Sequence, residues 1–200
     1  MPGETANKVK FNIQKCHYAP KTVDGTYGTP VALPGAVSLS LEQQGELSPF
    51  WADGIKYYVA SSNGGYEGDL ELALIPDQFR KDILGEEEDT NKVLFESANA
   101  STKEFALGFQ VDGDIGPIMF WFYNCTATRP SVTANTTEDT KEPTTDTITI
   151  SCASDTNGTV RAKTTADTDS EILSKWFESV YKKNQTSEAS AKAAAPAEVG

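Results

Sequence analysis

The side chains of this chain that could perform catalysis are few and widely separated. A single histidine, His17, directly follows Cys16, and the other cysteines, Cys125 and Cys152, lie far along the sequence. In a strand, successive side chains point to opposite faces, so this Cys-His dipeptide cannot place a nucleophile and a base together. The sequence contains no phosphate-binding loop, dinucleotide fingerprint or metal-ligand spacing. We therefore expect a protein that is not an enzyme and uses no catalytic residues and no cofactor.

Two carboxylates, Asp112 and Asp114, flank Gly113 and could in principle coordinate calcium. Asp-Gly-Asp is also the ordinary composition of a tight turn, so we expect a turn and no metal site. The three cysteines are odd in number and lack ligand spacing. This pattern is typical of reduced, buried thiols in a cytosolic product.

Acidic residues repeat at every second position along three predicted strands, which indicates polar faces opposite apolar ones. Within residues 67–75 leucines alternate with acids, and residues 37–42 and 104–112 show the same pattern. We expect one continuous acidic sheet face whose candidate residues are Glu42, Glu67, Asp69, Glu71, Glu104 and Asp112. The inward positions are Val37, Leu39, Leu41, Leu70, Leu72, Leu74, Phe105, Leu107, Phe109 and Val111.

Composition limits the possible partners. The chain has 200 residues, a formal net charge of -12 and 38% hydrophobic residues, enough for one globular domain with a core. Nucleic-acid binding requires clustered cations, so this charge disfavours a DNA-binding protein but permits a wall past which DNA slides. No secretion signal opens the chain and no run of about 20 apolar residues is present, so we expect no membrane association.

The remaining pattern predicts a mainly β fold, sandwich-like or barrel-like, with one short helix and one C-terminal amphipathic helix. Strands over 37–42 and 55–60 predict a hairpin, and its long loop over 43–54 carries Phe50 and Trp51, an apolar pair that favours a contact surface. Residues 117–123 are apolar on both faces, so Trp121 requires a second cover, either a helix or a neighbouring subunit. The contact candidates are Lys8, Lys10, Phe50, Trp51 and Trp121.

Helical spacing predicts a helix over 77–84, and a longer one with Thr168 and Glu171 as a capping box and an apolar stripe that continues to Tyr181. The acidic run 86–89 and the Thr-rich segment 130–146 are predicted loops. We expect one β domain over residues 1–183 and an unfolded Ala-, Glu- and Lys-rich tail over 184–200.

A different hypothesis is a secreted or surface-displayed β-sandwich that binds glycans or receptors. It would explain the Thr-rich loops, the Asn-x-Ser/Thr triplets and an exposed Trp. The missing signal peptide and the odd number of cysteines count against it.

Several segments, in this order, resemble the major tail proteins of long non-contractile-tailed bacteriophages, the group often called the phi13 type. They are residues 17–20 (HYAP), 27–37 (YGTPVALPGAV), 52–54 (ADG), 68–71 (GDLE), 83–85 (ILG), 123–131 (YNCTATRPS) and 162–166 (AKTTA). The likeness spans about residues 8–183 and carries no reaction chemistry. Some relatives continue into an immunoglobulin-like domain, which the sequence after Asn184 does not resemble.

This resemblance implies a structural virion protein that is assembled in the host bacterial cytoplasm and located in the tail. It implies hexameric rings stacked into a tube through which the phage DNA is ejected without specific binding. The implied partners are further copies of the chain, a tape measure protein, and tail tip and terminator proteins. The acidic face would line the lumen, and the aromatic loop and the N-terminal arm through Lys10 would join rings or subunits.

Overall fold

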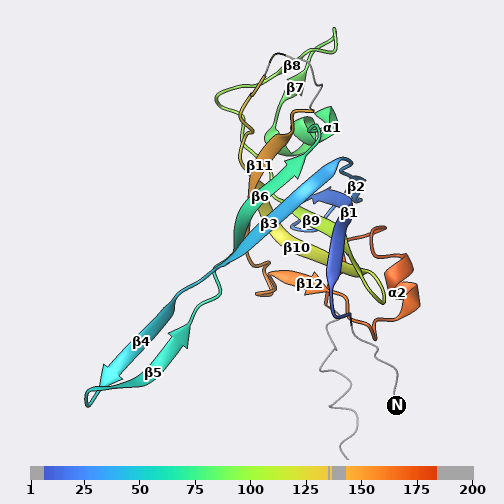
Figure 1. The fold of residues 1–200 in the computed structure, drawn as a ribbon. Coiled ribbons are helices and arrows are strands. Elements are labelled where there is room, and N and C mark those ends of the chain that lie inside the picture. The colour runs from blue at the N-terminus through green and yellow to red at the C-terminus, as the bar shows by residue number, and fades with distance from the viewer. Residues whose placement is uncertain (1–6, 135, 137–142, 184–200) are drawn as a thin grey trace, which may run out of the picture.

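The computed structural model describes residues 7–134, 136 and 143–183 (Figure 1). The predicted tail, 184–200, and part of the predicted loop over 130–146 lie outside these residues. The fold is mainly β, as predicted, with short helical segments. The strands are β1 (Lys10–Pro20), β2 (Val31–Ala32), β3 (Ala36–Gln44), β4 (Leu47–Ala52), β5 (Ile55–Ser61), β6 (Gly65–Leu72), β7 (Glu87–Glu88), β8 (Leu94–Phe95), β9 (Phe105–Gly113), β10 (Ile118–Ala127), β11 (Asp146–Cys152) and β12 (Arg161–Lys163). The helical segments are α1 (Asp77–Phe79), η1 (Arg80–Leu84) and α2 (Ser170–Ser174).

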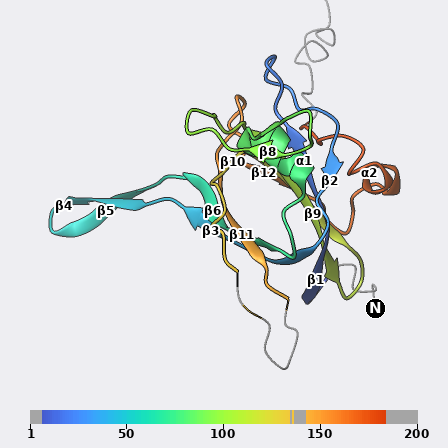
Figure 2. The same ribbon diagram turned by 90° about the horizontal axis from the view of Figure 1, so that it is seen from above.

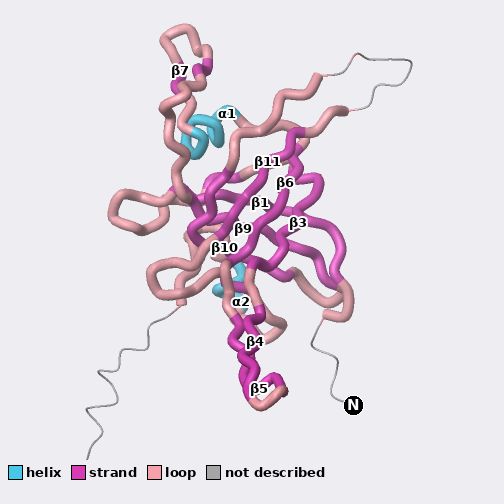
Figure 3. The backbone as a smooth tube through the Cα atoms, turned by 90° about the vertical axis from the view of Figure 1, so that its left-hand side faces the viewer, coloured by secondary structure: helices cyan, strands magenta, loops and turns pink. Residues whose placement is uncertain are grey.

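One antiparallel sheet forms the body, in the order β2-β1-β9-β10-β11-β6-β3, with β12 paired to β10. The sheet curls until β1 approaches β3, which gives a half-open barrel (Figure 2). Strands β4 and β5 pair only with each other and form a hairpin that projects from the body (Figure 3). We call this hairpin the aromatic arm.

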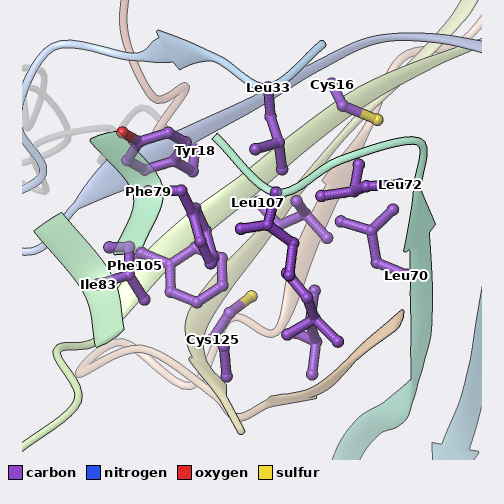
Figure 4. Close-up of a cluster of buried hydrophobic side chains, with 14 of the residues drawn as sticks. Cys16, Tyr18, Leu33, Leu70, Leu72, Phe79, Ile83, Phe105, Leu107 and Cys125 are labelled. Atoms are coloured by element: carbon purple, nitrogen blue, oxygen red, sulfur yellow. The ribbon is translucent and has the colours of Figure 1, made fainter. Parts of the chain in front are cut away.

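The inward side chains of the curled sheet form the main core, shown in Figure 4. Leu70, Leu107 and Ile148 are fully buried there, as their alternation in the sequence predicts. The helical segment over 77–84 closes one end of the barrel with Phe79 and Ile83, and it ends at Gly85, whose left-handed φ of 76° suits glycine. Its second half is a π-helix, which the apolar spacing does not distinguish from an α-helix.

Two predicted core positions, Val37 and Leu74, are exposed, so these predictions are wrong. Val37 is 50% exposed because a bulge between Ala36 and Ser38 shifts the strand phase. Leu74 is 71% exposed because β6 ends at Leu72. The predicted acidic loop at 86–89 instead contains β7, where Glu88 forms ion pairs with Lys81 and Lys92.

The outer face of β9 and β10 is covered by the C-terminal segment, which builds a second core around Trp121. The predicted apolar stripe supplies this cover, since Ile172, Leu173, Trp176, Phe177, Val180 and Tyr181 all pack there. The helix itself is shorter than predicted and covers only Ser170–Ser174. Its N-cap is Asp169, whose carboxylate accepts a hydrogen bond from the Glu171 N–H (2.8 Å), so the predicted capping box is wrong.

Candidate functional site

Four carboxylates lie together on the outer side of β3 and β6, opposite the core, and we call this surface the acidic face. It consists of Glu42, Glu67, Asp69 and Glu71. In the antiparallel register Glu67 lies directly opposite Glu42, while Asp69 and Glu71 lie opposite Ser40 and Ser38. Strand β11 extends the same surface with hydroxyl side chains, because Thr147 and Thr149 pair with Glu71 and Asp69.

Hydroxyl groups, and not cations, hydrogen-bond to this face. The Glu71 carboxylate accepts hydrogen bonds from Thr145 Oγ1 (2.7 Å) and Ser38 Oγ (2.8 Å), and Asp69 accepts one from Thr149 Oγ1 (2.8 Å). Donation by Thr145, and then by Ser38, lowers the pKa of Glu71. Among the described residues no lysine or arginine forms an ion pair with any of the four carboxylates. The surface therefore carries uncompensated negative charge at neutral pH.

The predicted extension of this face to Glu104 and Asp112 is wrong. Strand β9 is separated from β6 by β10 and β11, and its outer positions Ala106 and Gln110 are buried. Glu104 precedes β9 and pairs with Lys21 (2.5 Å). The Asp112 carboxylate accepts hydrogen bonds from the side chains of Gln14 (2.6 Å) and Gln110 (3.1 Å). Both acids therefore lie outside the acidic face.

The aromatic arm exposes an unusual amount of apolar side chain. Phe50 and Trp51 were predicted in a loop but lie on β4, and the connection to β5 is the tight turn at Asp53 and Gly54, both with positive φ. Phe50 pairs with Tyr58 across the hairpin, and Lys56 Nζ lies 5.6 Å from the centre of the Trp51 ring. The exposed large side chains are Leu47, Phe50, Trp51, Ile55, Tyr57, Tyr58 and Val59, each between 46% and 73% exposed.

The other predicted contact residues differ in their exposure. Trp121 is fully buried beneath the C-terminal segment. Its Nε1–H donates a hydrogen bond to the Trp176 carbonyl (3.0 Å), and its ring packs edge-on against Phe177. It is therefore not a contact residue, and the second cover of its strand is the chain's own C-terminal segment. Lys8 and Lys10 are exposed at the start of β1, where the Lys8 backbone N–H donates to Asp114 (2.9 Å).

The potentially reactive side chains do not converge on one site. Cys16 is buried in the main core, while the His17 ring stacks on Phe177 (4.6 Å between ring centres) and its Nδ1 contacts the Lys15 carbonyl. Burial raises the pKa of Cys16 to about 12, and burial beside Cys152 raises that of Cys125. Within the described part of the chain no group of three or more His, Cys, Asp or Glu side chains could hold a metal ion.

Asp114 receives the Lys8 N–H in the β9–β10 turn, and the Asn7 side chain closes that turn through bonds to Ile115 and Gly116. Asp114 thus lies in the predicted turn, whereas Asp112 lies near the end of β9. In residues 7–134, 136 and 143–183 no helix is long and apolar enough to cross a membrane.

Two of the solved structures to which this chain is similar come from the anti-feeding prophage. No protein-family model and no curated protein matches this chain. A chain of the anti-feeding prophage baseplate is 10% identical, with a TM-score of 0.44, and the alignment covers 80% of this chain and 96% of that one. A chain of the anti-feeding prophage cap, described as a tube-terminating cap, is 12% identical, with a TM-score of 0.35 and coverage of 82% and 99%. At this level neither likeness assigns a family to the protein.

Proposed function

We propose that this protein is a structural tail protein of a phage and, more specifically, the major subunit of its tail tube. In this proposal six copies form a ring, rings stack into a tube, and the tube conducts DNA during ejection. The protein acts as an assembly unit and not as an enzyme. The observation that carries the proposal is that one chain combines an uncompensated acidic sheet face with a projecting apolar arm.

The acidic face supplies the lumen wall in this proposal. Phosphates are repelled by carboxylates that have no neighbouring cations, so DNA passes the wall without adhering to it. Hydrogen bonds from Thr145 and Ser38 lower the pKa of Glu71, which keeps this position charged in mildly acidic surroundings. Glu42, Glu67, Asp69 and Glu71 are the lumen residues of the proposal, and Glu104 and Asp112 are not included.

The aromatic arm supplies the contact between copies. A two-stranded hairpin is marginally stable by itself in water, and this one adds seven large apolar side chains to its surface. A contiguous exposed apolar surface of this kind typically marks a protein contact. Copies of the same chain, a tape measure protein, and tip and terminator proteins are the partners that a tail subunit requires.

Electron microscopy of the purified protein at high concentration, with sedimentation of the same sample, tests the proposal. Wild-type protein should form hollow tubes or stacked rings. Trp51→Ala should remain folded but assemble poorly, whereas Leu74→Ala, at an apolar position outside the arm that is even more exposed, should assemble normally. A wild-type monomer that persists even with tail-tip components would contradict the proposal and favour the surface binding module. Normal tube yield with Trp51→Ala would remove the arm from the interface.

A further inference from the structure

An apolar groove opens where the barrel fails to close, between the first part of β1 and β3. Its volume is about 650 Å³, and its lining comes from β1, β3, β6, β9, β10 and β12. The floor contains Phe109 and Phe120, stacked at 4.9 Å between ring centres, with Leu39 and Leu41 beside them. Phe11 and Val37, on the two strands that border the gap, are 64% and 50% exposed. The groove is therefore an apolar surface that the described part of this chain leaves uncovered.

Cations surround this apolar floor. Lys10, Arg161 and Lys163 line the groove, with Arg161 above the Tyr66 ring (5.3 Å) and Lys163 above the Phe120 ring (6.0 Å). None of the three forms an ion pair with a carboxylate among the described residues. The site thus suits an occupant that is apolar along its length and carries a negative charge.

The aromatic arm has these properties. Its sides carry the exposed apolar residues, and the carboxylate of Asp53 stands at its tip, without an ion pair to any described cation. If each aromatic side chain offers about 150–250 Å², the four aromatic residues of the arm, 57–70% exposed, present roughly 500 Å². A standard interface buries about 800 Å² on each partner. The aromatic side chains therefore supply more than half of the area of a standard interface, and Leu47, Ile55 and Val59 add to it.

We propose that the aromatic arm of one copy docks in the apolar groove of another copy, with Asp53 among Lys10, Arg161 and Lys163. This inference rests on the proposed self-assembly and names the receptor of the arm. The arm projects away from the body (Figures 1 and 2), and none of its residues lines the groove. When each copy gives its arm to one neighbour and receives the arm of another, the contact is head-to-tail and continues from copy to copy, so it produces rings or filaments.

Two complementary variants test this receptor. The arm variant is Phe50→Ser with Trp51→Ser, and the groove variant is Phe11→Asp with Lys163→Glu, which changes only exposed side chains. A matched control, Val23→Asp with Lys103→Glu, makes the same change in charge by replacing an apolar residue and a lysine at exposed positions outside the groove. Circular dichroism and thermal melts establish that each variant folds. Sedimentation then measures association of each variant alone and of the two variants mixed.

Each variant alone should associate at least tenfold more weakly than wild type, and the control should behave as wild type. In an equimolar mixture, the intact arm of the groove variant should dock in the intact groove of the arm variant. The complex should stop at a heterodimer, because its remaining arm and its remaining groove both carry substitutions. A groove variant that assembles normally while the arm variant stays monomeric would overturn the inference and leave the proposed function standing. A mixture without heterodimers would also overturn it. A wild-type protein that never assembles would overturn the proposed function and the inference with it.

Discussion

The pair Glu42 and Glu67 gives a measurable test of the acidic face, because these carboxylates oppose each other directly in the β3–β6 register. Like charges opposite each other in a sheet are destabilising. Two unit charges about 6–8 Å apart in water repel by ~0.5–0.7 kcal/mol. Glu42→Gln keeps the shape and removes one charge, so it should raise the free energy of unfolding by about 0.5 kcal/mol at low salt.

Urea unfolding measures this difference, followed through the fluorescence of the buried Trp121 and Trp176. The Trp51→Ala background keeps the protein monomeric under the proposed assembly. The gain should shrink with salt, since the Debye length falls from ~30 Å at 0.01 M to ~3 Å at 1 M. Glu71→Gln is the matched control and should give no gain, because this carboxylate accepts hydrogen bonds from Thr145 and Ser38. A Glu42→Gln protein that is less stable than its parent, or differs from it equally at all salt concentrations, would refute the reasoning.

Three further outcomes are expected. In the same denaturation assay, Gly108→Ala should lower the free energy of unfolding by about 1–3 kcal/mol, because the new Cβ would lie 2.6 Å from the Trp121 ring. Gly116→Ala is the control and should be neutral, because a Cβ there meets nothing within 4 Å. Lys81 and Lys92 lower the pKa of Glu88 to about 2. The stability that the charged Glu88 contributes is therefore fully present above the ordinary carboxyl pKa of ~4.3 and is lost as the pH falls through about 2. The melting temperatures of wild type and Glu88→Gln should converge as the pH falls over this window. Glu67→Lys with Glu71→Lys should still permit tubes but impair DNA passage, and unchanged infectivity of particles that carry both changes would contradict the lumen assignment.

The sequence predicts strand faces well and strand neighbours poorly. Alternation along 67–72, 105–111 and 147–152 identifies buried Leu70, Leu107 and Ile148, because one strand face must be apolar wherever it borders a core. Alternation says nothing about which strands pair. The sheet order places β11 and β10 between β6 and β9, so Glu104 and Asp112 do not join the acidic face.

Local irregularities account for the other errors. A single bulge exposes Val37, and the early end of β6 exposes Leu74, and neither has a signal in the hydrophobic pattern. Residues 117–123 are apolar on both strand faces, which predicts that both faces are covered. This pattern does not show whether the second face is covered by the same chain or by a neighbouring subunit. The apolar stripe from Ile172 to Tyr181 is the decisive residue set, and it buries Trp121 within the same chain.

Charge and apolar contact oppose each other in this protein, and the balance determines how assembly should respond to salt. Copies with a formal net charge of -12 repel one another, while docking of the arm gains mainly from burial of apolar side chains. Added salt screens the repulsion between copies and leaves the apolar contribution largely intact. Self-association measured by sedimentation should therefore strengthen between about 0.05 M and 0.5 M NaCl, as screening of like charges requires. Binding to DNA through cations would weaken over the same range. Association that weakens steadily with salt would mean that ion pairs, such as those of Asp53 with the groove cations, dominate the contact over the aromatic side chains of the arm.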